Sequence, residues 1–203
     1  MKEDLGIPGS NLTRCKWCNG DDLYEHYHDE EWGVPVVGDQ ALFERLILEG
    51  MQAGLSWLTI LKKRAHMQSL FFEFDIPRLA QASEQEIESW LQDPGIIRHR
   101  GKLNAMVGNA VLARDMPDFS QWLWQFAPCD VRSDEQRSQV PSETDESRAM
   151  SKALKKAGFR FVGPTICYAF MQSVGMVNDH ARECFRYSEC EALVVSMRGD
   201  ESD

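Results

Sequence analysis

The chain has 203 residues, 43% of them hydrophobic, which is enough to bury a substantial core as one domain or as two small ones. It contains no apolar run of about eighteen residues and no signal-type apolar segment, so we expect no membrane partner and a cytoplasmic protein with reduced cysteines. Its net charge of −10 excludes a broad electrostatic grip on nucleic acid, because such a grip needs a basic face.

Apolar residues at helical spacing dominate the pattern along the chain. The first stripe runs from Leu42 to Met51, and Asp39 is its expected N-cap. Ser83 and Glu86 form an S-x-x-E capping signature ahead of a second helix. Further stripes follow over residues 103–111, 119–126 and 149–157. Because alternation with a period of two is scarce, we predict an all-α protein.

A polar stretch from Pro128 to Ser147 interrupts this pattern and is the expected linker. Loops of that length inside a compact domain usually serve a function or move. The linker divides a central helical block, about residues 36–127, from a C-terminal segment at residues 148–184. We expect residues 14–35 to return to this C-terminal segment.

The C-terminal segment predicts two helices joined by a tight hairpin. The first helix is expected to end at Gly158, and the second to begin at Pro164, directly after Gly163, and to stop at Gly175. Exposed backbone N–H groups at such a turn bind a phosphate without any side-chain charge, so an acidic chain can still hold DNA. An ordinary helical hairpin of a bundle fits the same pattern.

Two short basic groups are the other sign of contact with nucleic acid. The first contains Arg98, Arg100 and Lys102, and the second contains Lys152, Lys155, Lys156 and Arg160. They are compatible with a small footprint on DNA, although basic helix faces are usually only solvated.

A histidine and a cysteine stand four positions apart in the run VNDHAREC. On a helix, His180 and Cys184 would share one face and could bind one ion. The available partners lie near the other end of the chain: Cys15, Cys18, His26 and His28. Two thiolates and two imidazoles would close the shell of a tetrahedral, structural zinc that joins the two segments. The spacing leaves the choice of partners open, and buried hydrophobic cysteines are the alternative.

Five runs of the sequence are highly specific when taken together: RCKW, YEHYHDEEWGVP, LFERLILEGMQAGLSWLTILKKR, GIIRHRGKLNA and KALKKAGFRFVGPTICYAFMQSVGMVNDH. In these runs the chain resembles the DNA-3-methyladenine glycosylase I family of the helix-hairpin-helix DNA glycosylases. The resemblance implies a glycosylase domain over residues 14–184. Residues 1–13 then form an unmatched N-terminal extension, and residues 185–203 form a tail.

The resemblance implies a DNA repair enzyme that flips 3-methyladenine out of alkylated double-stranded DNA and hydrolyses its N-glycosidic bond without a lyase step. We expect it to act as a monomer. It implies one structural zinc, whose ligands fall on four residues: Cys15, His28, His180 and Cys184. Cys18 is then an extra thiol beside the site. Related enzymes place a lysine and an aspartate at the positions of Thr165 and Asn178, and both replacements agree with a monofunctional enzyme.

The resemblance places the base pocket at Tyr24, Tyr27, Glu49 and Trp57, and DNA contact at the hairpin, at Gly163 and Thr165. Such an enzyme holds the extruded base in an aromatic pocket. Glu49 lies at the edge of an apolar stripe, so we expect a half-buried carboxylate that accepts hydrogen bonds from the amino edge of adenine. We assign it the catalytic role of favouring a cationic base. A solvated glutamate and core aromatics are the alternative.

Local spacing supports the aromatic roles. Tyr24 and Tyr27 stand three residues apart, on one helical face, and Ser56 is expected to cap the helix that aims Trp57. Two other functions remain to be separated from the glycosylase. One is a zinc-stabilised DNA-binding or damage-sensing module without catalysis, which would release no free base. The other is a zinc hydrolase, which needs an open coordination position that four protein ligands do not leave.

Overall fold

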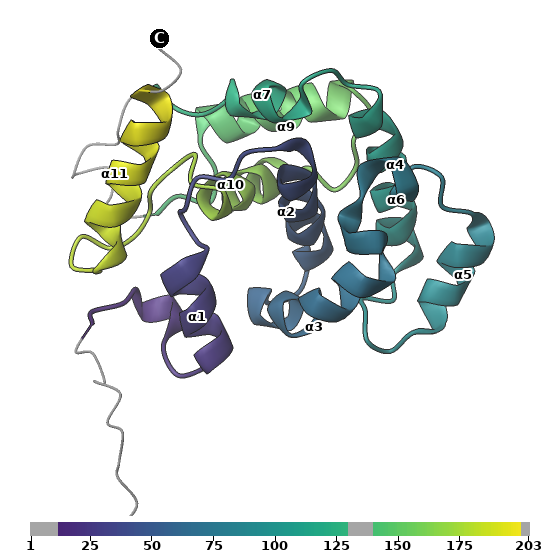
Figure 1. Cartoon of the computed structure of the whole chain (residues 1–203), viewed down its shortest axis with the longest axis horizontal. Coiled ribbons are helices and arrows are strands. Elements are labelled where there is room, and N and C mark those ends of the chain that lie inside the picture. Colours follow the sequence, from purple (N-terminus) through teal and green to yellow (C-terminus); the bar gives the residue numbers. More distant parts are fainter. Residues whose placement is uncertain (1–11, 130–139, 200–203) are drawn as a thin grey trace, which may run out of the picture.

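The fold is that of a computed structural model, which describes residues 12–129 and 140–199. Within these ranges every regular element is helical and none is a strand, which confirms the predicted all-α class (Figure 1). None of the described helices is long and apolar enough to cross a lipid bilayer.

The N-terminal part is a small helical unit formed by η1 (Lys16–Cys18) and α1 (Asp22–Glu30). The Asp21 side chain caps α1 by accepting hydrogen bonds from the amides of Leu23 and Tyr24. After α1 the chain runs along α10, where the amide of Gly33 donates to the carbonyl of Gln172 at 3.2 Å. The N-terminal segment therefore lies against the C-terminal one.

Helix α2 (Asp39–Gln52) lies at the centre of the molecule and is buried on nearly all sides (Figure 1). The prediction that Asp39 caps it was wrong. Gly38, at a φ of 94°, is the N-cap, and the Asp39 carboxylate instead accepts the amide of Ser120 at 2.8 Å. Helix α3 (Trp57–Leu70) follows a short turn, and Ser56 caps it as predicted, by accepting the amide of Thr59.

The central block continues with five short or medium elements: η2 (Phe72–Phe74), α4 (Ile76–Leu79), α5 (Glu84–Gln92), α6 (Arg100–Arg114) and α7 (Phe119–Trp124). The predicted capping box of Ser83 and Glu86 is present at the start of α5. Helix α6 packs against both α2 and α4 and thereby closes the core on the side away from α1.

Two of the three residues in the basic group at the start of α6, Arg100 and Lys102, make contacts within the protein. Lys102 is buried, and its Nζ donates to the carbonyls of Met51 at 2.8 Å and Ala53 at 2.7 Å. Its ammonium thus satisfies carbonyl groups at the C-terminal end of α2. Arg100 pairs with two glutamates of α5. The interpretation of this group as a DNA-binding patch is therefore wrong for Lys102.

The predicted helical hairpin is formed by α9 (Asp145–Lys156) and α10 (Pro164–Ser173), which pack against each other. Gly158 and Gly175 follow the two helices at φ values of 100° and 74°, which confirms both predicted stops. A capping box of Thr144 and Ser147 starts α9 inside the stretch that we read as a linker. Part of that stretch, residues 130–139, lies outside the described residues.

The tail assigned to residues 185–203 contains a further helix, α11 (Arg186–Gly199), at the left edge of the molecule in Figure 1. Cys190 of this helix is buried. A thiol on α11 therefore contributes to packing rather than facing solvent.

Candidate active site

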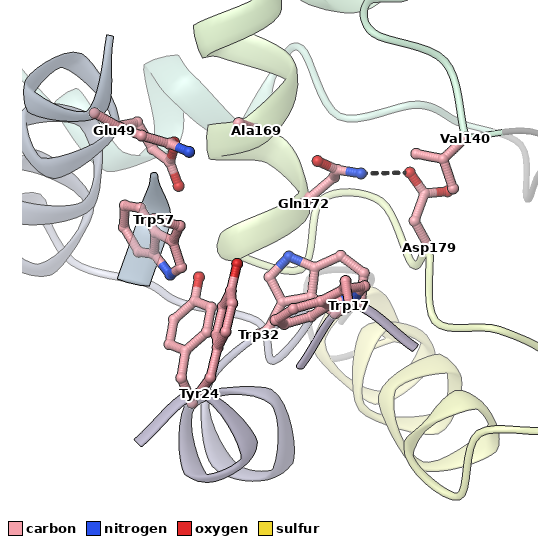
Figure 2. Close-up of a pocket in the computed structure, with 11 residues that line it drawn as sticks. Trp17, Tyr24, Trp32, Glu49, Trp57, Val140, Ala169, Gln172 and Asp179 are labelled. Carbon is pink, nitrogen blue, oxygen red and sulfur yellow. Dashed lines mark hydrogen bonds between the residues drawn. The ribbon is translucent and has the colours of Figure 1, made fainter. Parts of the chain in front are cut away.

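The four residues predicted for the base pocket surround one cavity of about 290 Å³, between α1, α2, α3 and α10 (Figure 2). Tyr24 and Tyr27 come from α1, Glu49 from α2 and Trp57 from the first position of α3. The rings of Tyr27 and Trp57 lie 5.4 Å apart, centroid to centroid, at an angle of 52°. The sequence predicted the helices that carry these side chains, and the structure shows that all four line the same cavity.

Helical periodicity did not identify the other residues of the pocket. Trp17 and Trp32 also line the cavity, and the centroids of their two rings lie 5.0 Å apart. The centroid of the Trp17 ring lies 4.9 Å from that of Tyr24. Val140 reaches the cavity from the stretch read as a linker. Trp17 and Trp32 lie on short or irregular segments, so helical periodicity could not identify them. They do lie in the runs RCKW and YEHYHDEEWGVP, which carry the resemblance to the glycosylase family.

Glu49 is the buried acid of this pocket, with only 4% of its surface exposed. We expected a half-buried side chain, and the structure buries it more deeply. Burial raises the pKa of Glu49 to about 8, while the charge of Arg45 and a hydrogen bond from Ser173 act in the opposite direction. At neutral pH the empty pocket therefore favours the protonated form, and a cationic ligand would favour the carboxylate.

Trp57 offers the pocket an unused hydrogen-bond donor. Its side chain is 7% exposed, and its indole Nε1 is buried with no hydrogen-bond partner in the part of the chain that the structure describes. Leaving such a donor unpaired costs about 1–3 kcal/mol, a cost that a ligand acceptor removes. The cavity wall thus combines aromatic faces, one buried acid and one buried donor without a partner, a set that suits a flat heterocycle with both acceptor and donor edges.

Asn178 and Asp179 lie beside the pocket in a stretch without regular structure. Residues 177–181 form no helix. Asn178 accepts the amide of His180 at 3.2 Å, and its own amide group donates to the carbonyl of Tyr187 at 2.9 Å. Asp179 lines the cavity and accepts hydrogen bonds from Tyr168 and Gln172. Its carboxylate orders the rim of the pocket opposite Glu49.

A second cluster joins the two ends of the described chain. It comprises Cys15, His28, His180 and Cys184, whose ligand atoms all lie within 4.8 Å of one another. The Sγ of Cys184 is 3.3 Å from Nε2 of His28 and 3.5 Å from Nδ1 of His180. All four residues are buried, and a set of two thiols and two imidazoles could hold a metal ion.

In each histidine of the cluster, the ring nitrogen that does not face the other ligand atoms has a hydrogen-bond partner, as is usual for histidines that bind a metal. Nδ1 of His28 lies 2.8 Å from Asp29, and Nε2 of His180 lies 3.0 Å from the carbonyl of Trp32. Each partner accepts a hydrogen bond from the ring nitrogen, which leaves Nε2 of His28 and Nδ1 of His180 with the lone pairs that an ion could use. Arg14 in turn holds the Asp29 carboxylate by two nitrogens.

The geometry separates the alternatives that the spacing left open. Cys18 is buried beside the cluster, but its Sγ donates to the carbonyl of Cys15 at 3.0 Å and it is not a member of the cluster. His26 lies on another cavity, between α1 and α3. One expectation was wrong, because Cys184 precedes α11 and His180 lies in irregular chain, so a turn rather than a helix face brings them together.

The turn of the hairpin leads directly into α10, a helix that also lines the pocket. Gly163 is the N-cap of α10, whose later residues Ala169 and Gln172 reach the cavity. Thr165 is exposed, and a β-carbon built at Gly163 would meet nothing within 4 Å. The turn therefore has open space in front of its backbone.

Comparison with known proteins agrees with this arrangement. DNA-3-methyladenine glycosylase 1 of Escherichia coli (strain K12) is 47% identical over 182 residues, which are 87% of this chain and 97% of that protein. A crystal structure of a 3-methyladenine DNA glycosylase I superposes with a TM-score of 0.80 at 46% identity and covers 85% of this chain and 98% of that one. A variant of such an enzyme in complex with 3-methyladenine gives a TM-score of 0.77 at 32% identity, covering 86% and 97%.

The all-helical fold and the aromatic pocket with its buried acid define an enzyme of the DNA glycosylase class, a hydrolase of N-glycosyl bonds. The family within that class follows from the sequence, which matches the methyladenine glycosylase family over residues 17–187. The chain belongs to this family.

Proposed function

We propose that this protein is a monofunctional glycosylase that removes 3-methyladenine from alkylated double-stranded DNA. The observation that carries the proposal is the pairing, in one aromatic cavity, of the buried Glu49 acid with the unpaired indole N–H of Trp57. The relatives named for 3-methyladenine, one of them in complex with that base, support the same substrate.

The pocket suits a base that carries positive charge. Methylation at N3 makes the adenine ring of the nucleotide cationic, and a buried carboxylate stabilises a cation far more than water does. Glu49 would ionise against the base and accept a hydrogen bond from its amino group. Tyr24, Trp17 and Trp57 provide ring faces against which the extruded base stacks.

The chemical step needs little further help. When the bond between C1′ and N9 breaks, its electron pair neutralises the cationic ring, and water adds to C1′ and loses a proton to solvent. The residues that a lyase would use are of other types here, since Thr165 carries no amine and the Asn178 amide is bonded to the carbonyl of Tyr187. Both features support hydrolysis without a lyase step.

The hairpin is the proposed DNA anchor. The open space in front of Gly163 and the exposure of Thr165 let a phosphate approach the backbone amides at the start of α10. Exposed Lys155 and Lys156 on the preceding helix add positive charge beside the turn. A backbone anchor of this kind explains how a chain with a net charge of −10 can hold DNA.

We assign the four-residue cluster to one structural zinc, because two thiolates and two imidazoles leave no open position for substrate water. No disulfide joins any of the cysteines that the structure describes, which suits a reducing compartment such as the cytoplasm. The proposed glycosylase unit is residues 14–184, acting as a monomer. The ion would hold the N-terminal wall of the pocket against the C-terminal segment.

The decisive experiment is incubation with methylated duplex DNA and chromatography of the released bases. Release of 3-methyladenine, lost in Glu49→Gln, is the expected result. DNA binding without release of any base by the wild-type protein would show a non-catalytic binding module instead. Cleavage of the DNA strand during the same incubation, before alkali is added, would contradict the monofunctional assignment.

A further inference from the structure

Arg45 is a buried cation that the proposed mechanism does not yet use. It lies on α2, one helical turn before Glu49, and only 8% of its surface is exposed. Its Nη2 pairs with the carboxylate of Glu31, while its Nη1 is buried with no hydrogen-bond partner among the described residues. Burying a guanidinium nitrogen unpaired costs stability, so a residue of purely structural use would be apolar here.

The guanidinium of Arg45 lies against the ring of Tyr27, which lines the pocket. Its central carbon lies 5.9 Å from the centre of the Tyr27 ring. Tyr27 also lines a second cavity, of about 320 Å³, which reaches Glu31 and Arg64. One face of Tyr27 therefore serves the base pocket, and the other faces a cluster of charged groups.

The charges of this cluster balance without Glu49. Arg64 lies 2.5 Å from Glu31 and 2.8 Å from Glu44. Since Arg45 also pairs with Glu31, two arginines and two glutamates form one connected group. Although burial opposes its ionisation, Arg45 and Arg64 hold the pKa of Glu31 below its usual value. An ionised Glu49 adds one uncompensated negative charge, which is the charge that a cationic base would neutralise.

Other groups also face Glu49. Tyr24 and Tyr27 approach from α1, Ser173 from α10, and Asp179 lies across the cavity. None of these groups is a cation, and Arg45 is the positive charge that acts on the Glu49 carboxyl.

We propose that Arg45 is a positioning residue of the base pocket, which supports Tyr27 from behind and keeps the Glu49 carboxylate available as the counter-charge of a cationic base. This inference rests on the proposed function. Loss of the cation would leave Ser173 as the only group that opposes burial, so Glu49 would hold its proton to higher pH and bind the cationic base less well. On lowering the pH, the activity would then begin to fall at a higher pH than in the wild type.

The test is the pH profile of kcat/KM for release of 3-methyladenine from methylated duplex DNA. This profile reports ionisations of the free enzyme, and we expect the wild-type profile to rise through an apparent pKa of about 8, that of Glu49. Arg45→Met should move this midpoint upward by about one unit, which lowers kcat/KM roughly tenfold near neutral pH and restores most of it in alkali. If Arg45→Met does not fold, Arg45→Gln replaces it in this test, and we expect the same upward shift of the midpoint.

Two matched variants separate charge from packing. Arg45→Lys keeps a cation and should keep the midpoint close to that of the wild type. Arg64→Met removes the other partner of Glu31 and should lower the melting temperature without moving the midpoint, since Arg64 does not act on Glu49. A loss in Arg45→Met that is equal at every pH would overturn the inference, because only packing would then be involved.

A second measurement separates this inference from the function on which it rests. Carbon NMR of the Glu49 carboxyl in the ligand-free protein gives its midpoint without turnover. A midpoint that does not rise in Arg45→Met, in an enzyme that releases base, refutes the role of Arg45 and leaves the function intact. A midpoint that rises in a protein whose wild type releases no base refutes the function and leaves only the coupling of Arg45 to Glu49.

Discussion

The Sγ of Cys184 lies 3.3 Å from Nε2 of His28, although 156 positions separate the two residues in the chain. His28 belongs to α1, which also carries Tyr24 and Tyr27 of the pocket. The cluster therefore fixes the position of an aromatic wall as well as joining distant segments.

Cys184→Ser should remove the bound metal and destabilise the protein. A cross-link that closes a loop of more than a hundred residues contributes about 4–5 kcal/mol in the chain-entropy model. We expect a fall in melting temperature of roughly 10 °C, together with zinc content near zero by atomic emission. A strong chelator should produce the same fall in the wild-type protein.

Cys18→Ser is the matched control for this prediction. Cys18 is buried beside the cluster but donates to the Cys15 carbonyl, a bond that a serine hydroxyl can also form. The variant should keep one metal ion per chain. Loss of metal in Cys18→Ser, with retention in Cys184→Ser, would show that the wrong thiol has been assigned.

Gly33→Ala should disturb the cluster through His180. A β-carbon at Gly33 would lie 3.0 Å from Nε2 of His180, and Gly33 has a φ of +80°, where alanine is strained. Gly54 has the same φ, and a β-carbon there would meet nothing within 4 Å. We expect Gly54→Ala to lose about 1 kcal/mol of stability with full metal content, and Gly33→Ala to lose more, with reduced metal.

Glu49 should make the stability of the ligand-free protein fall as pH rises. Its folded pKa is about 8, against 4.5 for an ordinary glutamate, so between these values the folded state binds more protons than the unfolded state. The contribution is fully present below about pH 4.5 and is lost by about pH 8, a loss of about 4 kcal/mol. Denaturant unfolding of the wild type and Glu49→Gln across this range should show the variant with the flatter dependence.

Trp57→Phe tests the indole donor separately from the aromatic face. Phenylalanine keeps a ring beside Tyr27 but removes the unpaired Nε1–H. We expect the rate of 3-methyladenine release to fall about tenfold, the worth of one hydrogen bond to a ligand, with little change in melting temperature. An unchanged rate would mean that the indole contributes only its face.

Gly163→Ala tests the hairpin as a phosphate anchor. Gly163 has an ordinary φ of −63°, and an added β-carbon would meet no atom of the protein, so the variant should fold normally. A methyl group in front of the turn would obstruct a phosphate, and we expect DNA affinity to fall about tenfold, or about 1.4 kcal/mol. Fluorescence anisotropy with a labelled duplex measures this change.

Gly108→Ala on α6 provides the control for the hairpin variant. Gly108 is exposed in a helix, and a β-carbon there would also meet nothing within 4 Å. This variant should gain about 0.5–1 kcal/mol of stability and bind DNA as the wild type does. Equal losses of affinity in the two variants would argue against the hairpin as the anchor.

Helices and their ends were predictable because they depend on neighbouring residues. The capping box at Ser83, the cap at Ser56 and the glycine stops at Gly158 and Gly175 all follow from local chemistry, and all are present. Asp39 failed as a cap because Ser120, distant in sequence, takes its carboxylate. Tertiary contacts of this kind leave no periodic signal.

The site was less predictable than the fold for the same reason. Glu49 is enclosed by aromatic side chains from α1 and α3, and Ser173 of α10 acts on its pKa, none of which the stripe on α2 shows. Lys102 looked like part of a basic patch, but its Nζ is bound inside the protein by two carbonyls at the C-terminal end of α2. The sequence around a basic residue does not show whether its side chain faces solvent or binds the carbonyl groups at the end of a helix.

The joining of segments 165 residues apart, at Cys15 and His180, also has a consequence for biosynthesis. A nascent chain on the ribosome would expose Tyr24 and Tyr27 early, long before the turn that anchors their helix has left the exit tunnel. Binding of the proposed metal ion would then be a late event in maturation, and the pocket wall would reach its final position only after translation has passed Cys184.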